Sequence, residues 1–274
     1  MKNMVKIEIR RAFCNKSFFI SIFIGVLITG SQIFTWALPS SKWLDNYLLG
    51  KGEYPVSLFN TWIGATGQTF QLTLFFMVLP ILACIPYSGS CFVDHECGYQ
   101  MHILTKSGKY HYYAAKCTAV YLSGGIAVLI PLVVNLIATA MIVPALIPEA
   151  SSRTFPIFEH SMWSGLFYTH PFYYTAGYFL LIFLYAGLFA LWGILASFYL
   201  KNKYMVLLLP FIIYALAGFI LSYTGNYKYS PELFLRPDQP AGADFNYICI
   251  LYVAVLTGFI ILLTYKGRKG EILD

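Results

Sequence analysis

The chain has 274 residues, of which 58% are hydrophobic and only 11% are charged, and its mean hydropathy is +0.66. Soluble domains carry about 25% charged residues, so this composition excludes an ordinary soluble protein and predicts a polytopic membrane protein. The 18 Lys and Arg residues outnumber the 12 Asp and Glu residues. These basic residues are divided among short segments between apolar runs, so we expect no nucleic-acid partner. Six dispersed cysteines do not suggest a disulfide framework.

Residues 1–17 can form an amphipathic helix, which presents an apolar face and a basic face. The apolar face would hold Val5, Ile9, Ala12 and Phe13, and the basic face Lys2, Lys6 and Arg10. Such a helix could lie on an anionic cytoplasmic leaflet, or it could simply be the basic flank of the first span. The apolar run 18–38 that follows is longer than the apolar core of a signal peptide, so we expect an uncleaved first span.

Six apolar segments predict an all-α membrane domain over residues 1–274, with spans at about 18–38, 69–92, 119–143, 177–200, 204–223 and 247–265. Each is long enough to cross a hydrocarbon core of about 30 Å. Span 69–92 contains Pro80 and Pro86, which predict a kinked or broken helix. Span 177–200 carries small residues that let another helix approach closely, namely Ala186, Ala190, Gly193 and Ser197.

Charge predicts the orientation of these spans. Thirteen Lys and Arg residues fall on the side of the two termini and five on the other, so the positive-inside rule places the termini and segment 94–116 in the cytoplasm. We therefore expect a multi-pass protein of the cell membrane, bacterial in origin. The outer loops 39–68, 144–174 and 224–246 could hold specificity. Segment 56–63 could lie in the outer interface through Leu58, Phe59 and Trp62, and we expect Trp36, Trp43, Trp62 and Trp163 to be mostly interface anchors.

No motif in the chain predicts catalysis. His95-Glu96 begins like a zinc-protease HExxH motif, but Tyr99 stands where the second histidine would be. Cys91, His95, Cys97 and His102 would not converge on a metal along one helix, and the chain has no P-loop and no GxSxG motif. We expect neither a cofactor nor a metal. The spans also lack the ionisable residues usual in ion-coupled transporters, so an energy input from a separate subunit is favoured.

Segment 94–116 carries a pattern that resembles one family. Asp94 stands four residues before Gly98, Ile103 and Leu104 follow, and Lys109 precedes Lys116 by seven residues. Together with the basic N-terminal helix and the six-span layout, this pattern resembles the membrane subunits of the ABC-2 type permease family. Two positions depart from the family pattern, because Tyr99 replaces a frequent Thr and Lys106 replaces a proline.

The resemblance implies a short coupling helix at about residues 94–104, seated in a cleft of a separate cytoplasmic ABC ATPase. Asp94 and Glu96 would face basic residues of the partner, and Gly98 would permit close backbone approach. The apolar side chains that would supply contact area are Met101, Ile103 and Leu104. Three lysines would hold this element against the inner leaflet: Lys106, Lys109 and Lys116.

The same resemblance implies that the chain pairs with a second permease copy or a paralogue in the lipid bilayer. Export of a peptide or another amphipathic substrate is the expected activity, with ATP hydrolysis on the partner subunit and none on this chain. Two alternatives stay open: a membrane scaffold or sensor that binds a cytoplasmic partner through segment 94–116, and a simple solvated loop.

Overall fold

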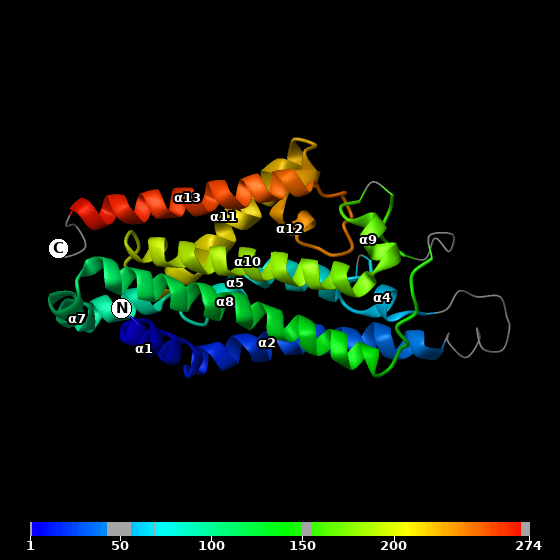
Figure 1. The fold of residues 1–274 in the computed structure, drawn as a ribbon, viewed down its shortest axis with the longest axis horizontal. Helices are drawn as coiled ribbons and strands as arrows, with labels where there is room; N and C mark the ends of the chain where they lie inside the picture. Colours follow the sequence, from blue (N-terminus) through cyan, green and yellow to red (C-terminus); the bar gives the residue numbers. More distant parts are fainter. Residues whose placement is uncertain (1, 43–55, 68, 150–154, 160, 270–274) are drawn as a thin grey trace.

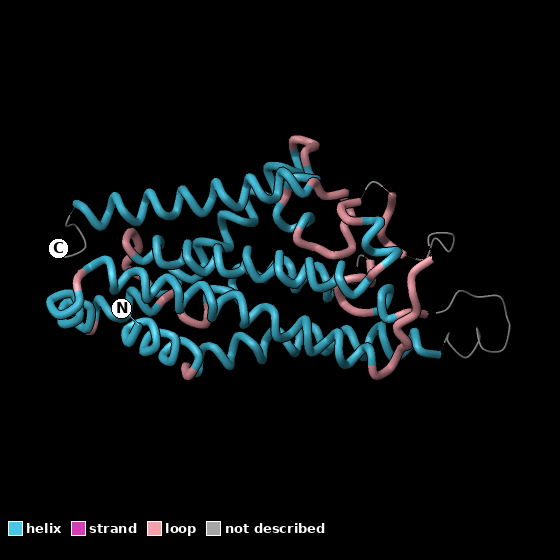
Figure 2. Tube along the Cα trace, in the orientation of Figure 1, coloured by secondary structure: helices cyan, strands magenta, loops and turns pink. Residues whose placement is uncertain are grey.

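The computed structural model describes residues 2–42, 56–67, 69–149, 155–159 and 161–269. Within these ranges the regular structure is entirely helical (Figure 2). The long helices run roughly along one axis, and α1, α7 and the end of α13 gather at the same end of the bundle (Figure 1). The expectation of an all-helical membrane domain agrees with this arrangement.

The N-terminal segment forms helix α1 (Lys2–Phe13), which confirms the predicted amphipathic helix. The apolar face of this helix packs against the rest of the protein. Ala12 is fully buried, and Met4, Ile9 and Phe13 pack against the protein core, mainly along α8. The chain turns at Asn15, whose side chain caps the start of α2 (Lys16–Gln32) by accepting a hydrogen bond from the Ser17 N–H. Helix α2 continues through the π-helical turn η1 (Ile33–Ala37).

The segment that follows was expected in the outer interface, and this expectation is wrong. Helix α4 (Leu58–Thr61) and the residues after it turn into the bundle. Leu58, Phe59, Trp62 and Ile63 are all buried. A buried backbone N–H needs a hydrogen-bond acceptor. The side-chain oxygen of Asn135 in α8 accepts the Ile63 N–H at 3.0 Å and so satisfies it. Of the other expected tryptophan anchors, Trp36 is exposed, Trp163 is half-buried and Trp43 lies outside the described residues.

The predicted span 69–92 is broken, as its prolines suggested. Helix α5 (Phe70–Cys84) ends before a turn that contains Pro86, and α6 (Ser90–Glu96) begins after it. Fifteen residues of α-helix rise about 22 Å, which is less than a hydrocarbon core. Among the described residues, five helical segments are long and apolar enough to cross a membrane, and α5 is a shorter apolar helix beside them.

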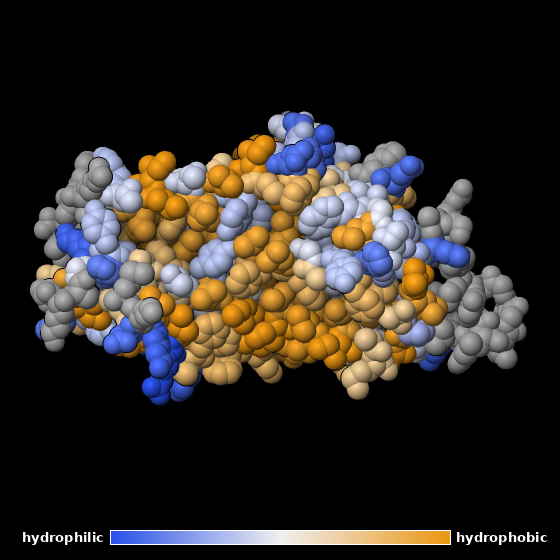
Figure 3. Space-filling view, in the orientation of Figure 1, coloured by the Kyte–Doolittle hydropathy of each residue, from blue (hydrophilic) through white to orange (hydrophobic). Residues whose placement is uncertain are grey.

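The five segments are α2 with its extension to Lys42, α8 (Lys109–Ala140), α10 (Pro171–Ser197), α11 (Lys203–Tyr223) and α13 (Phe245–Lys269). Helices α8 and α10 form the centre of the bundle. A Cβ atom built on Gly124 would lie 2.6 Å from the Cβ of Ala190, so the predicted close approach at the small residues of α10 is confirmed. Figure 3 shows a hydrophobic band around the middle of the visible face, with hydrophilic residues toward the two ends.

Three short helices lie on the side of the bundle away from α7 (Figure 1): α9 (Ser164–Thr169), η3 (Tyr227–Tyr229) and α12 (Pro231–Phe234). Charged residues of this region are not all exposed. Arg236 and Asp238 are buried and form an ion pair with each other at 2.7 Å. Gln239 is also buried, and its side chain accepts the Met162 N–H and donates to the Met162 carbonyl, each at 2.7 Å. These contacts connect the two loops of this end to each other.

Candidate functional site

The polar segment after α5 forms two short helices joined at Gly98, and we call residues 90–107 the elbow. Its arms are α6 and α7 (Tyr99–Ser107). Gly98 has φ +69°, a left-handed conformation that side chains other than glycine rarely adopt. A Cβ on Gly98 would meet nothing within 4 Å. The expected single helix over 94–104 is therefore wrong, because two helices meet at Gly98 and the positive φ of the bend requires a glycine there.

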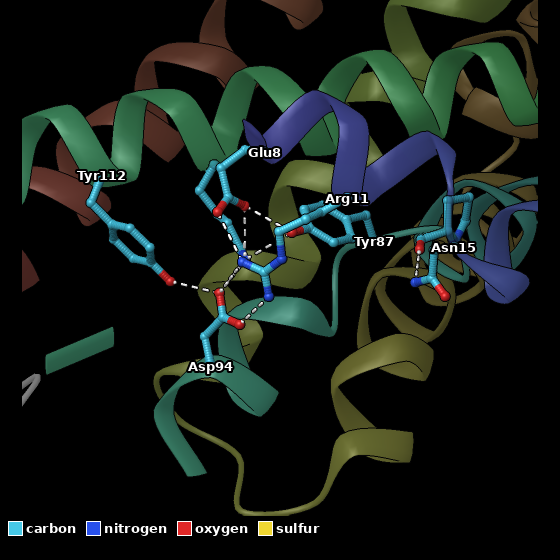
Figure 4. A network of polar contacts seen from close by, with 8 residues as sticks. Glu8, Arg11, Asn15, Tyr87, Asp94 and Tyr112 are labelled. Atoms are coloured by element: carbon cyan, nitrogen blue, oxygen red, sulfur yellow. Dashed lines mark hydrogen bonds and ion pairs between the residues drawn. The ribbon is translucent and has the colours of Figure 1, made fainter. Parts of the chain in front are cut away.

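Four charged side chains meet where the elbow joins the bundle, and we call them the ion cluster: Glu8, Arg11, Asp94 and Lys116. Arg11 contacts Asp94 at 2.7 Å and Glu8 at 2.9 Å, while Lys116 contacts Glu8 at 3.1 Å and hydrogen-bonds to Asp94. Figure 4 shows how α1 and α6 bring these groups together beside α8. Two acids and two bases balance, so the cluster carries no net charge.

Tyrosines complete the hydrogen bonding of the cluster. Tyr87, in the turn between α5 and α6, donates to Glu8 at 2.8 Å, and Tyr112 of α8 donates to Asp94 at 3.0 Å (Figure 4). The Lys116 ammonium also lies over the Tyr87 ring, 4.6 Å from its centroid. Buried charges are tolerated when they are paired and hydrogen-bonded in this way.

Electrostatics keep Asp94 ionised. Burial alone would raise the pKa of Asp94, but the hydrogen bond and charge of Arg11 and the contact with Lys116 outweigh it, so the Asp94 pKa lies below its usual range. Burial and the neighbouring Glu8 carboxylate raise the pKa of the Tyr87 hydroxyl. Tyr87 is therefore a neutral hydrogen-bond donor over the physiological pH range.

The structure corrects the expected roles of two residues in this segment. Asp94 is 2% exposed and Lys116 is fully buried. Asp94 therefore does not present charge to a partner in this conformation, and Lys116 does not lie against a leaflet. Both were expected at the surface because each stands in a polar stretch of sequence, but each is neutralised by a residue that is distant in the chain.

The remaining predicted residues have mixed positions. Glu96 and Met101 are exposed, the latter by 51%. Ile103 and Leu104 are half-buried and pack against the core, so the elbow uses them at least partly for its own attachment. Lys109, at the start of α8, is half-buried. Lys106 belongs to α7, but its side chain lies outside the described part of the structure.

Sequence reasoning missed four members of this arrangement: Glu8, Arg11, Tyr87 and Tyr112. One signal was present, since Glu8 is the only acid among residues 1–17 and stands three residues before Arg11 on the same helix. An acid in a segment otherwise rich in basic residues suggests a specific partner. The partner Lys116 is 108 positions away, and no local pattern identifies it.

The arrangement connects three helices that are distant in the sequence. The cluster joins α1, α6 and α8 through ion pairs, so a displacement of the elbow would act directly on both helices. Within the described ranges, no group of three His, Cys, Asp or Glu residues could hold a metal ion. Comparison with known proteins finds no matching family model, no matching curated protein and no matching solved structure.

Proposed function

We propose that this chain is the membrane subunit of an ABC-2 type transporter, which exports a peptide or another amphipathic molecule and is powered by a separate ATPase. One observation supports the proposal above the others. The elbow lies at the same end of the bundle as α1 and the end of α13 (Figure 1), and the ion cluster connects it to α1 and α8. On this proposal, that end of the bundle faces the cytoplasm.

The elbow has an exposed surface that a partner could bind. Met101 on α7 is half exposed, and Glu96 is exposed at the end of α6. An exposed apolar side chain and an exposed carboxylate on the same elbow can contact a groove with a basic rim. The partner would press on the elbow, and the ion cluster would carry that displacement to α8, which packs along α10 at the centre of the bundle. Asp94 would transmit the displacement through its ion pairs and would not touch the partner, because it is buried.

The bundle interior also favours an external energy source. Residues 17–38, 70–84, 117–140, 171–197, 204–223 and 247–265 contain no Asp, Glu, Lys, Arg or His. Ion-coupled transporters usually carry ionisable groups at membrane depth. Energy from ATP hydrolysis on another subunit requires none there.

The proposal is tested by purifying the tagged chain in mild detergent from its native membrane and assaying the preparation for an associated ATPase. We expect an ATPase to co-purify. Met101→Ala should weaken that association about fivefold or more, as truncation of a central interface residue does. Glu96→Lys should weaken it as well, through loss of charge complementarity.

Two matched variants serve as controls. Met205→Ala removes an equally exposed methionine near the start of α11, and Glu159→Lys makes the same charge change in the loop before α9, at the other end of the bundle. Neither should alter the association. If no ATPase accompanies the chain, or if all four variants behave alike, the transporter proposal is rejected. Association with a non-ATPase partner that Met101→Ala weakens would instead identify a scaffold or sensor.

A further inference from the structure

A crevice of about 790 Å³ lies beside the ion cluster, between α1, the 85–89 turn with α6, and the beginning of α11. Neither Glu96 nor Met101 lines it, so it is separate from the surface proposed for the ATPase. Two apolar helices begin at its edge, α2 at Lys16 and α11 at Lys203. Because each is long and apolar enough to span a membrane, the crevice lies where the lipid head groups of one leaflet would be.

The charge of the crevice favours an anion. Its basic side chains are Arg10 and Arg11 of α1 and Lys203 of α11, and its acid is Asp94. Asp94 is neutralised by contacts with Arg11 and Lys116. The ion cluster has two basic groups and two acids, and Arg10 and Lys203 add two further basic groups. This set therefore has two positive charges without a balancing acid. Arg10 and Lys203 approach from different helices, as a site that surrounds an anion requires.

Polar groups in the wall could complete such a site. Ser90 is one of the residues that line the crevice, and its buried hydroxyl oxygen has no hydrogen-bond partner among the described residues. A buried hydroxyl without a partner costs free energy, and an anionic oxygen would relieve that cost by accepting a hydrogen bond from it. The Lys203 side chain is positioned nearby, because its Cγ and Cε lie 3.7 Å from a Cβ built on Gly89.

The edge of the crevice is apolar, which distinguishes a lipid from a small soluble anion. Ile7, Pro86 and Leu207 line it together with the polar groups. Ile7 is 53% exposed although it stands beside Glu8 of the buried cluster. A ligand with a phosphate and attached hydrocarbon would contact both kinds of wall. The apolar sides of α2 and α11, which begin here, would continue the contact along the acyl chains.

We propose that this crevice binds the phosphodiester head group of an anionic phospholipid. Arg10 and Lys203 contact the phosphate, Ser90 donates a hydrogen bond to it, and the first acyl carbons lie against Ile7 and Leu207. Arg11 contributes to the local potential but remains engaged with Glu8 and Asp94.

Native mass spectrometry of the purified full chain, titrated with phosphatidylglycerol or phosphatidylcholine, tests the proposal. We expect phosphatidylglycerol to be retained at least tenfold more tightly than phosphatidylcholine. The double variant Arg10→Gln, Lys203→Gln should bind phosphatidylglycerol about 30-fold more weakly, at about 1 kcal/mol for each basic group lost. Arg11 is left unchanged so that the ion cluster stays intact.

The matched control is Lys6→Gln, Lys201→Gln, which removes the same two charges from exposed residues near this end that do not line the crevice. It should retain phosphatidylglycerol like the unmodified chain, and unfolding temperatures without lipid should agree for all three proteins. If both double variants lose phosphatidylglycerol binding equally, the effect comes from general surface charge and the proposed site is wrong. Equal retention of both lipids, or displacement of phosphatidylglycerol by millimolar inorganic phosphate, would overturn the assignment to a lipid.

Discussion

Replacing Lys116 with methionine tests the ion cluster most directly. The substitution keeps an unbranched side chain of similar length and removes only the ammonium. Lys116 is fully buried, and the carboxylates that it contacts, Glu8 and Asp94, have side chains that are 1% and 3% exposed. In Lys116→Met these two acids would have to share the single charge of Arg11. One buried negative charge would then lack compensation.

Breaking a buried ion pair by removal of one partner costs about 3–5 kcal/mol. For a large domain each kcal/mol lowers the unfolding temperature by about 2–4 °C, so a fall of about 6–20 °C is expected. Thermal unfolding of the detergent-solubilised protein, followed by intrinsic fluorescence, measures this shift. The control is Lys109→Met, seven residues earlier on the same helix and outside the cluster, for which about 0.5 kcal/mol or less is expected.

A second substitution separates charge balance from packing. Glu8→Gln combined with Lys116→Met restores neutrality, since Arg11 and Asp94 then pair alone. We expect the double variant to be more stable than Lys116→Met, with a coupling energy of about 1–3 kcal/mol in the mutant cycle. If Lys116→Met and Lys109→Met shift the unfolding temperature equally, or if the two cluster substitutions simply add, the cluster does not stabilise the elbow as argued.

Three further predictions concern the same framework. The Asp94 pKa is lower in the folded state than its ordinary value of about 3.9. The stabilisation that the Asp94 carboxylate contributes is therefore present above about pH 4 and is lost as pH falls through the folded pKa. Asp94→Asn should lower the unfolding temperature at pH 7 and make the unfolding temperature fall less steeply in acid. Gly98→Ala should cost about 1–2 kcal/mol because of the positive φ, whereas Gly30→Ala, in a helix with open space around it, should be neutral or stabilising by the same thermal assay. Asn135→Leu should cost about 1–3 kcal/mol, since it leaves the buried Ile63 N–H without its acceptor, and faster hydrogen exchange at Ile63 is the specific readout; unchanged exchange there would contradict this role.

The sequence was sufficient for those features that depend on local composition. Transfer of an apolar segment into lipid is a sum over neighbouring residues, so each of the six apolar runs coincides with a helix of the bundle. Five of these helices are long enough to span a membrane, while α5 ends at Cys84 and α8 begins already at Lys109. The proline-containing span was correctly expected to break, because a proline lacks the N–H that a helix needs. The N-terminal helix was also correct, since an apolar face at helical spacing is visible in twelve residues.

The sequence misled where a residue's environment comes from distant parts of the chain. Leu58, Phe59 and Trp62 look like interface residues between polar neighbours, yet they are buried. Asn135, more than seventy positions away, accepts the hydrogen bond of the next backbone N–H, that of Ile63. Asp94 looks like a surface acid in a polar loop, and only its contact with Arg11, 83 positions earlier, shows otherwise.

What the sequence determined by itself is therefore the set of apolar helices and the polar segment between them, because hydrophobic transfer and backbone breaks are local properties. What only the tertiary structure decided is which charges of that segment are exposed and which are buried. The energy of a charged side chain depends on whether an opposite charge is within about 4 Å, and that distance is set by the packing of α1, α6 and α8. Packing therefore makes Asp94 and Lys116 part of an internal connection and leaves Glu96 and Met101 exposed at the surface.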